Sequence, residues 1–132
     1  MDKLFLDANV LFSAAYSTNA AVAKLWTLTG AELVTSRYAV AEAERNLDSV
    51  DQLGRLTELL AEVTILADTL AIALGEQVVL PEKDLPILAA AVNGNCTHLI
   101  TGDVHHFGPY FGEKLVGVLV LLPAEYLRRR SR

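Results

Sequence analysis

The sequence predicts a three-layer α/β/α sandwich built on a central parallel sheet of four or five strands. Short apolar stretches alternate with segments of helical periodicity, which is the pattern of repeated strand–helix–strand units. The strand candidates are apolar on both faces, as in a sheet that helices cover on each side. The chain has 132 residues and no detectable repeat or linker, so we expect one domain spanning 1–132.

Six short segments rich in apolar and β-branched residues are the strand candidates. The first is apolar at Leu4, Phe5 and Leu6 and stops at Asp7. The segment THLITGD is expected to be a strand that ends at Asp103. The six candidates cover 3–7, 32–36, 63–66, 77–80, 97–103 and 116–123.

Helical periodicity and capping residues predict the helices. Ser36 is a suitable N-cap for the segment that follows it, and Gly30 is a suitable stop for the segment before it. The helix that contains Pro86 is expected to open at Asp84 and to close at Gly94. The predicted helices cover 20–30, 37–49, 52–62, 67–74 and 81–95, and a short one follows the last strand.

Three acidic residues that lie far apart in the sequence are expected at one edge of the sheet. In right-handed strand–helix–strand units, the carboxyl ends of the strands and the amino ends of the helices meet at the same edge. Asp7 and Asp103 end strands, and Asp84 opens the helix that leads into the second of them. Ligands of open α/β sheets bind at this edge, so the three residues mark a candidate site.

Carboxylates packed together repel one another unless a cation or protons compensate their charge. Ligands that are all oxygen suit Mg²⁺ or Mn²⁺ better than Zn²⁺. Such a site can activate water and stabilise charge on a phosphate. The sequence has no His/Cys spacing typical of zinc sites and no GxxxxGK[ST] phosphate loop.

Each of these residues also has a purely structural interpretation. Asp7 and Asp84 are suitable helix caps, and Asp103 follows Gly102 in a turn-forming dipeptide. A further acid on the 37–49 helix lies away from the predicted core. The pattern alone does not choose between Glu42, a partner for Arg45, and Glu44.

The sequence resembles the PIN-domain family, which includes the nuclease toxins of bacterial and archaeal toxin–antitoxin pairs. The resemblance is carried by four motifs in the family's order. These are FLDANVLFSA at 5–14, LVTSRYAVAEAERNL at 33–47, DLPILAAAVNGNCTHLITGD at 84–103 and VGVLVL in the region of 117–122. Residues 50–80 match no motif, and Pro86 is a departure that a helix start accepts.

The resemblance implies a metal-dependent endoribonuclease that uses Mg²⁺ or Mn²⁺. Its acidic positions fall on Asp7, Glu42, Asp84 and Asp103 as catalytic residues, and Asp7, Asp84 and Asp103 are the expected metal ligands. Asn9 and Thr101 are the expected supporting residues. The implied partners are an RNA substrate and an antitoxin protein, and we also expect a homodimer.

Composition agrees with a cytoplasmic protein and gives no sign of a membrane protein. We expect no signal peptide and no membrane span, and the single cysteine, Cys96, is expected to be a buried apolar residue. The net charge of −5 is unusual for a protein that binds nucleic acid, but a cluster of metal-binding carboxylates contributes to it. The arginines at 128–132 are interpreted as a solvated end of the chain.

Two side-chain groups are given structural rather than functional interpretations. His105 and His106 follow Asp103 directly and are expected in a surface loop, with contact to a phosphate or a role as an acid as the alternative. Trp26 is expected in the core, and an exposed part of it would suit a dimer or antitoxin groove.

Two alternatives to a metal-dependent nuclease remain. A phosphohydrolase with an aspartyl nucleophile needs D-x-D at the end of a strand, whereas Asn9 occupies the third position here. A non-catalytic PIN-like binding or assembly module is the other alternative. Metal binding at the acidic edge distinguishes it, since a scaffold need not bind Mn²⁺.

Overall fold

A six-stranded sheet forms the centre of the computed structural model, which describes residues 1–68 and 78–131. Its strand order is β3-β2-β1-β4-β6-β5. The first five strands in that order are parallel, and β5 at one edge is antiparallel to β6. The strands are β1 (Asp2–Leu6), β2 (Ala31–Ser36), β3 (Thr64–Leu66), β4 (His98–Ile100), β5 (Lys114–Leu115) and β6 (Val118–Leu121).

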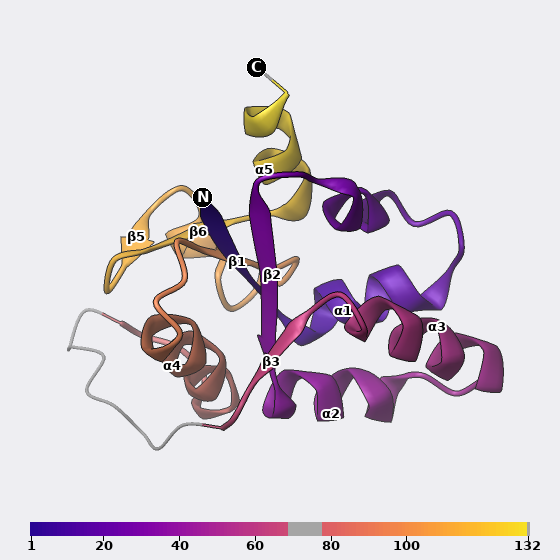
Figure 1. The fold of residues 1–132 in the computed structure, drawn as a ribbon. Coiled ribbons are helices and arrows are strands. Elements are labelled where there is room, and N and C mark those ends of the chain that lie inside the picture. The colour runs from indigo at the N-terminus through magenta and orange to yellow at the C-terminus, as the bar shows by residue number, and fades with distance from the viewer. Residues whose placement is uncertain (69–77, 132) are drawn as a thin grey trace.

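Helices lie on both sides of this sheet. Figure 1 shows α4 on one side and α1 and α3 on the other, which confirms the expected three-layer α/β/α sandwich. The α-helices are α1 (Ala8–Tyr16), α2 (Arg37–Asn46), α3 (Val50–Leu60), α4 (Leu85–Asn93) and α5 (Pro123–Arg130). The 3-10 helices are η1 (Ala21–Thr27), η2 (Glu82–Asp84) and η3 (Gly108–Tyr110).

The central strand β1 shows why the sequence pattern predicts a covered sheet. Its residues Leu4, Phe5 and Leu6 are all fully buried, although alternate side chains of a strand point to opposite faces. In α4, the stretch 87–91 is also buried, so this helix is apolar around most of its circumference. Burial on both faces of β1 therefore places the core on both sides of the sheet.

The expected caps set the positions of two helices. The Ser36 hydroxyl accepts a hydrogen bond from the Ala39 N–H, which satisfies one of the free donors at the start of α2. Pro86 lies in the first turn of α4, and Gly94 follows its last residue. Both helices begin at the carboxyl edge of the sheet, where β1, β2 and β4 end.

The helix expected at 20–30 is a 3-10 helix, η1, and covers only Ala21–Thr27. Short-range bonds close its turns: the Ala23 N–H donates to the Ala20 carbonyl, and the Leu28 N–H donates to the Leu25 carbonyl. The Trp26 indole N–H also donates to the Leu59 carbonyl at 3.0 Å. Trp26 is half-buried against the core, so tertiary contacts outweigh the local helical preference here.

Two expected strands were wrong in extent or in existence. The strand expected to reach Asp103 ends at Ile100, because the chain turns there and the Asp103 carboxylate accepts backbone N–H groups of the turn. The candidate at 77–80 forms no strand over its described part, 78–80. The Val79 N–H donates instead to the Tyr110 hydroxyl at 2.8 Å.

Several element boundaries also differ from the sequence expectation. The helix α1 directly follows Asp7, where no separate helix was assigned, and α2 ends at Asn46 instead of residue 49. The helix expected at 52–62 begins earlier, at Val50. The helix expected at 67–74 falls largely on residues outside the described part of the chain.

The antiparallel strand β5 was not expected. It pairs with β6 through a tight turn in which Val116 has φ 51° and Gly117 has φ 85°. Two successive left-handed residues suit the turn of a two-residue β-hairpin, but a valine is a poor sequence signal for one.

Two smaller expectations can also be compared with the structure. Cys96 is buried, as expected, and burial raises the pKa of its thiol to about 11. Among the helices of the described residues, none combines the length and hydropathy that crossing a membrane requires.

Candidate metal centre

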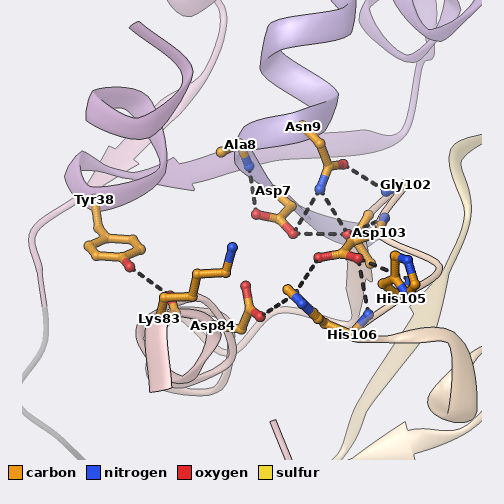
Figure 2. A network of polar contacts seen from close by, with 11 residues as sticks. Asp7, Ala8, Asn9, Tyr38, Lys83, Asp84, Gly102, Asp103, His105 and His106 are labelled. Atoms are coloured by element: carbon orange, nitrogen blue, oxygen red, sulfur yellow. Dashed lines mark hydrogen bonds and ion pairs between the residues drawn. The ribbon is translucent and has the colours of Figure 1, made fainter. Parts of the chain in front are cut away.

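Asp7 lies where β1 passes directly into α1. Its N–H donates to the Ile100 carbonyl, which continues the pairing of β1 with β4. Its Oδ1 accepts the Ala8 N–H at 2.7 Å, so the side chain does cap the helix. Its other oxygen, Oδ2, is turned toward β4 and the loop that follows it (Figure 2). Asp7 therefore has the structural role foreseen for it and also presents an acidic group at the carboxyl edge.

Asn9 and Thr101 hold the Asp7 carboxylate from two directions. The Thr101 hydroxyl donates to Asp7 Oδ2 at 2.9 Å, and Asn9 Nδ2 donates to the same oxygen at 3.2 Å. The Asn9 side chain also accepts the Gly102 N–H at 2.7 Å through its Oδ1. These contacts join α1 to the loop after β4 and give the carboxylate a defined orientation.

Asp103 lies in the turn after β4. Its Oδ1 accepts the backbone N–H groups of His105 and His106 at 3.1 and 3.0 Å, and its own N–H donates to the Thr101 hydroxyl at 3.1 Å. The turn role considered for Asp103 is therefore real. Its Oδ2 is not used in this turn and lies 2.9 Å from the imidazole Nδ1 of His106.

Asp84 ends η2 immediately before α4. Its side chain makes no capping hydrogen bond to this helix, so the capping interpretation does not explain it. The residue is nevertheless only 7 % exposed, which is unusual for an aspartate without a capping role. Its Oδ2 lies 2.7 Å from His106 Nδ1, so a single imidazole nitrogen touches both Asp84 and Asp103 (Figure 2).

One cleft at the carboxyl edge of the sheet collects the four acidic residues considered in the sequence. Glu42, on α2, is half-buried and lines it, whereas Glu44 is exposed and is not among the lining residues. The two glutamates are two residues apart on a helix, so they point in different directions. The residues lining the cleft are Asp7, Ala8, Asn9, Phe12, Glu42, Asn46, Lys83, Asp84 and Asp103.

The acids of this cleft are electrostatically costly in the metal-free chain. Burial raises the pKa of Asp7 to about 6, the hydrogen bonds from Thr101 and Ala8 oppose this rise, and the charges of Asp84 and Glu42 add to it. Burial also raises the pKa of Asp84; the charge on His106 lowers it and that on Asp103 raises it. Burial is the leading cause in both, so the charged forms of these carboxylates are destabilised relative to the neutral forms.

The chemistry of the donor set fits a divalent cation. Four carboxylates from separate elements line one cleft, and hard cations such as Mg²⁺ and Mn²⁺ favour oxygen ligands. Asp84 Oδ2 is buried, and its close contact is the ion pair with His106 Nδ1 at 2.7 Å. A cation would compensate the charge that burial and mutual repulsion leave on these groups.

Two residues of this region were not foreseen in the sequence. His106 lies in a partly exposed turn, as expected, but its Nδ1 is buried between two carboxylates, a contact the sequence did not indicate. The signal available was its position three residues after Asp103, which a tight turn brings back to the acid. Lys83 also lines the cleft, and its only sequence signal was its place next to Asp84.

Two solved structures share the fold of this chain. One is VapBC2 from Rickettsia felis, bound to a DNA fragment from its promoter. It matches with a TM-score of 0.68 and 14 % sequence identity, and the match covers 89 % of this chain and 96 % of that chain. VapBC-1 from nontypeable Haemophilus influenzae matches with a TM-score of 0.62 and 19 % identity over 92 % of this chain and 98 % of that one. At these identities the similarity concerns the fold.

Sequence comparison gives the family. The comparison with curated proteins yields no match. The family model described as "PIN domain" matches residues 3–105, which include all four acidic residues of the cleft. With that match over most of its length, and with an acidic cleft at the carboxyl edge of a parallel sheet, the chain belongs to the PIN-domain family.

Proposed function

We propose that the protein is a metal-dependent endoribonuclease that hydrolyses phosphodiester bonds of single-stranded or structured RNA. The observation that carries the proposal is the convergence of Asp7, Glu42, Asp84 and Asp103 on one cleft. A bound Mg²⁺ or Mn²⁺ ion would supply an activated water and stabilise negative charge on the phosphate. Membership in the PIN-domain family supports the same activity.

The side chains of the cleft have separate roles in this proposal. Asp7, Asp84 and Asp103 hold the metal, and Asn9 and Thr101 orient Asp7 through their hydrogen bonds to its Oδ2. Glu42 completes the metal site or accepts the proton of the attacking water. The nucleophile in this proposal is a metal-activated water and no covalent enzyme intermediate forms, because carboxylates dominate the site and no motif of the sequence offers an activated serine, cysteine or lysine.

Cleavage of labelled RNA tests this function. We expect the wild-type protein to cleave RNA in the presence of Mn²⁺ or Mg²⁺, and we expect cleavage to stop when excess chelator is added. Asp7→Asn and Asp103→Asn keep the side-chain size but remove the charge, so each should lower the cleavage rate by at least about 100-fold. Circular dichroism of both variants establishes that the fold is retained.

Two outcomes of this assay would count against the proposal. Activity that persists in excess chelator, or that is unchanged in both variants, would exclude the metal-dependent mechanism. A folded wild-type protein that binds Mn²⁺ but cleaves none of a broad set of RNAs would favour the non-catalytic binding module instead.

For its biological role, we propose that the protein is a cytoplasmic toxin of a toxin–antitoxin pair and acts as a homodimer. The support is the shared fold with VapBC2 of Rickettsia felis and VapBC-1 of nontypeable Haemophilus influenzae. The family resemblance of the sequence likewise implies an RNA substrate and an antitoxin protein as partners.

Growth of cells that express the protein tests the toxin role. Expression of the wild-type chain should arrest growth, whereas Asp7→Asn should not. Co-expression of a small open reading frame found next to its gene should restore growth. Normal growth with active wild-type enzyme present would exclude the toxin role while leaving the nuclease proposal intact. Sedimentation of the purified chain measures its oligomeric state.

A further inference from the structure

We propose that His106 is a nitrogen ligand of the same metal centre, and that Asp84, Asp103 and His106 together form a mixed nitrogen–oxygen site that prefers Mn²⁺ to Mg²⁺. The inference rests on the proposed function, since it names a ligand and a metal preference for that cleft. It adds to the all-carboxylate site a residue that the sequence predicted to lie in a surface loop.

The position of His106 is the first observation. Its Nδ1 lies 2.7 Å from Asp84 Oδ2 and 2.9 Å from Asp103 Oδ2. The ligand atoms of the three residues all lie within 4.8 Å of one another. Neighbouring ligands of an octahedral ion with bonds of about 2.1 Å lie roughly 3 Å apart. The three atoms therefore already have a spacing that a single ion can bridge.

The second observation is that two of these atoms are buried without a hydrogen bond. Asp84 Oδ2 and His106 Nδ1 are shielded from solvent, and within the described residues they are the buried side-chain nitrogen and oxygen atoms that have no hydrogen-bond partner. Their contact with each other is an ion pair at 2.7 Å. Buried polar atoms left in this way are rare, and an ion shared by both atoms satisfies them.

The third observation is that the turn after β4 fixes the imidazole beside the acids. The backbone N–H groups of His105 and His106 donate to Asp103 Oδ1, which brings His106 back over the carboxylate. Figure 2 shows the His106 side chain extending between Asp84 and Asp103, whereas the His105 ring lies away from Asp84. The same turn thus supplies one carboxylate and one imidazole to the cleft.

A nitrogen ligand changes which ion the site prefers. Mg²⁺ binds oxygen ligands almost exclusively and retains several water molecules. Imidazole favours transition metals, and affinity for nitrogen-containing sites rises from Mn²⁺ along the first-row series. Replacing one oxygen ligand by the His106 imidazole should therefore lower the affinity of the site for Mg²⁺ relative to its affinity for Mn²⁺.

The competing interpretation makes His106 a hydrogen-bond donor that only holds Asp84 and Asp103 apart. One nitrogen cannot bind an ion and donate a proton at the same time, so the two interpretations predict different surroundings for the metal. A spectroscopic measurement of the atoms bonded to the ion separates them, whereas a loss of activity in a variant would not.

Pulsed electron paramagnetic resonance on the full-length chain with one equivalent of Mn²⁺ makes this measurement. The expected result is a ¹⁴N modulation from a directly bound imidazole. The modulation should change to a ¹⁵N pattern when histidine is isotopically labelled, so the identification of a histidine ligand does not depend on any variant folding. It should disappear in His106→Ala and persist in His105→Ala, the matched control next to it.

Binding titrations of the same proteins give a second measurement. In His106→Ala we expect Mn²⁺ affinity to fall by roughly tenfold or more, a loss at least as large as that from removing an outer partner of a metal ligand. Mg²⁺ affinity should fall less, so the Mn²⁺/Mg²⁺ preference should narrow. His105→Ala should bind both ions as the wild type does.

Each remaining outcome overturns the inference. Mn²⁺ that binds in the cleft without a histidine nitrogen excludes His106 as a ligand but leaves the proposed nuclease standing. A nitrogen signal that disappears in His105→Ala and remains in His106→Ala also overturns it. Failure of the wild-type protein to bind Mn²⁺ at all would overturn both this inference and the proposed function.

Discussion

Asp7 and Asp103 each use one carboxylate oxygen to organise the local backbone. Asp7 Oδ1 caps α1, and Asp103 Oδ1 accepts the N–H groups of its own turn. In Asp103 the second oxygen faces His106 at the cleft, and in Asp7 it is held by Thr101 and Asn9. A role in capping or in a turn therefore occupies only one oxygen of each carboxylate and does not by itself argue against a functional role.

Glu42 and Glu44 are a natural pair for testing which helix position serves the site. Glu42 lines the cleft and Glu44 is exposed outside it. We expect Glu42→Gln to lower the rate of RNA cleavage by at least about tenfold, since loss of a general base typically costs more than this. Glu44→Gln should keep the wild-type rate under the same Mn²⁺ conditions. Equal effects of the two changes would contradict the assignment of Glu42.

Lys83 brings a positive charge to the rim of an otherwise acidic cleft. We expect it to contact an RNA phosphate, so Lys83→Ala should weaken RNA binding and reduce the slope of log affinity against log salt by about 0.7 to 1. The measurement uses the Asp103→Asn background to prevent cleavage. Lys114→Ala, an exposed lysine on β5, is the control and should leave the slope unchanged. An unaltered slope in Lys83→Ala would contradict the proposed contact between Lys83 and an RNA phosphate.

At the scale of elements, the Ser36 cap stabilises the start of α2, the helix that carries Glu42. The Ser36 hydroxyl accepts the Ala39 N–H at 3.2 Å in a buried position at the end of β2. Ser36→Ala should lower the free energy of unfolding by about 1 kcal/mol, because the donor loses its partner. Urea denaturation measures this. Ser13→Ala, an exposed change on α1, should stay within about 0.5 kcal/mol of wild type. Equal stabilities of the two variants would show that the cap contributes little.

At the scale of the whole molecule, the buried acids should make stability depend on pH when no metal is bound. Burial raises the pKa of Asp7 from 3.8 to about 6, so between these values the folded protein holds a proton that the unfolded chain has released. The free energy of unfolding therefore falls as pH rises through this window. This decrease in the free energy of unfolding is complete above about pH 6 and amounts to roughly 3 kcal/mol at most.

Urea denaturation in chelator at pH 5.0 and pH 7.5, conditions on either side of Asp7's raised pKa, tests this expectation. His98 acts in the opposite direction, because burial lowers its pKa and stability is lost as pH falls below its ordinary value. The comparison with Asp7→Asn cancels this contribution. The gain in stability on going to pH 5.0 should be larger in wild type than in Asp7→Asn. Parallel pH profiles for the two proteins would contradict the raised pKa of Asp7.

Local sequence information was sufficient wherever a feature depends on neighbouring residues. The alternation of apolar strands and helices, the Ser36 cap and the Pro86-to-Gly94 limits of α4 follow from periodicity and backbone chemistry, and all are present. The meeting of Asp7, Asp84 and Asp103 at one edge also follows, because the handedness of strand–helix–strand units dictates it.

Only the tertiary structure decided the features that depend on distant contacts. Periodicity alone left Glu42 and Glu44 open, although the family resemblance favoured Glu42; which of them faces the cleft depends on the rotation of α2 about its axis, which packing against the rest of the fold sets. The 3-10 form of η1 accompanies the Trp26 bond to Leu59, and the position of His106 depends on where the loop after β4 meets Asp84. Sequence periodicity describes which residues share an element, whereas long-range packing determines which side chains of different elements meet.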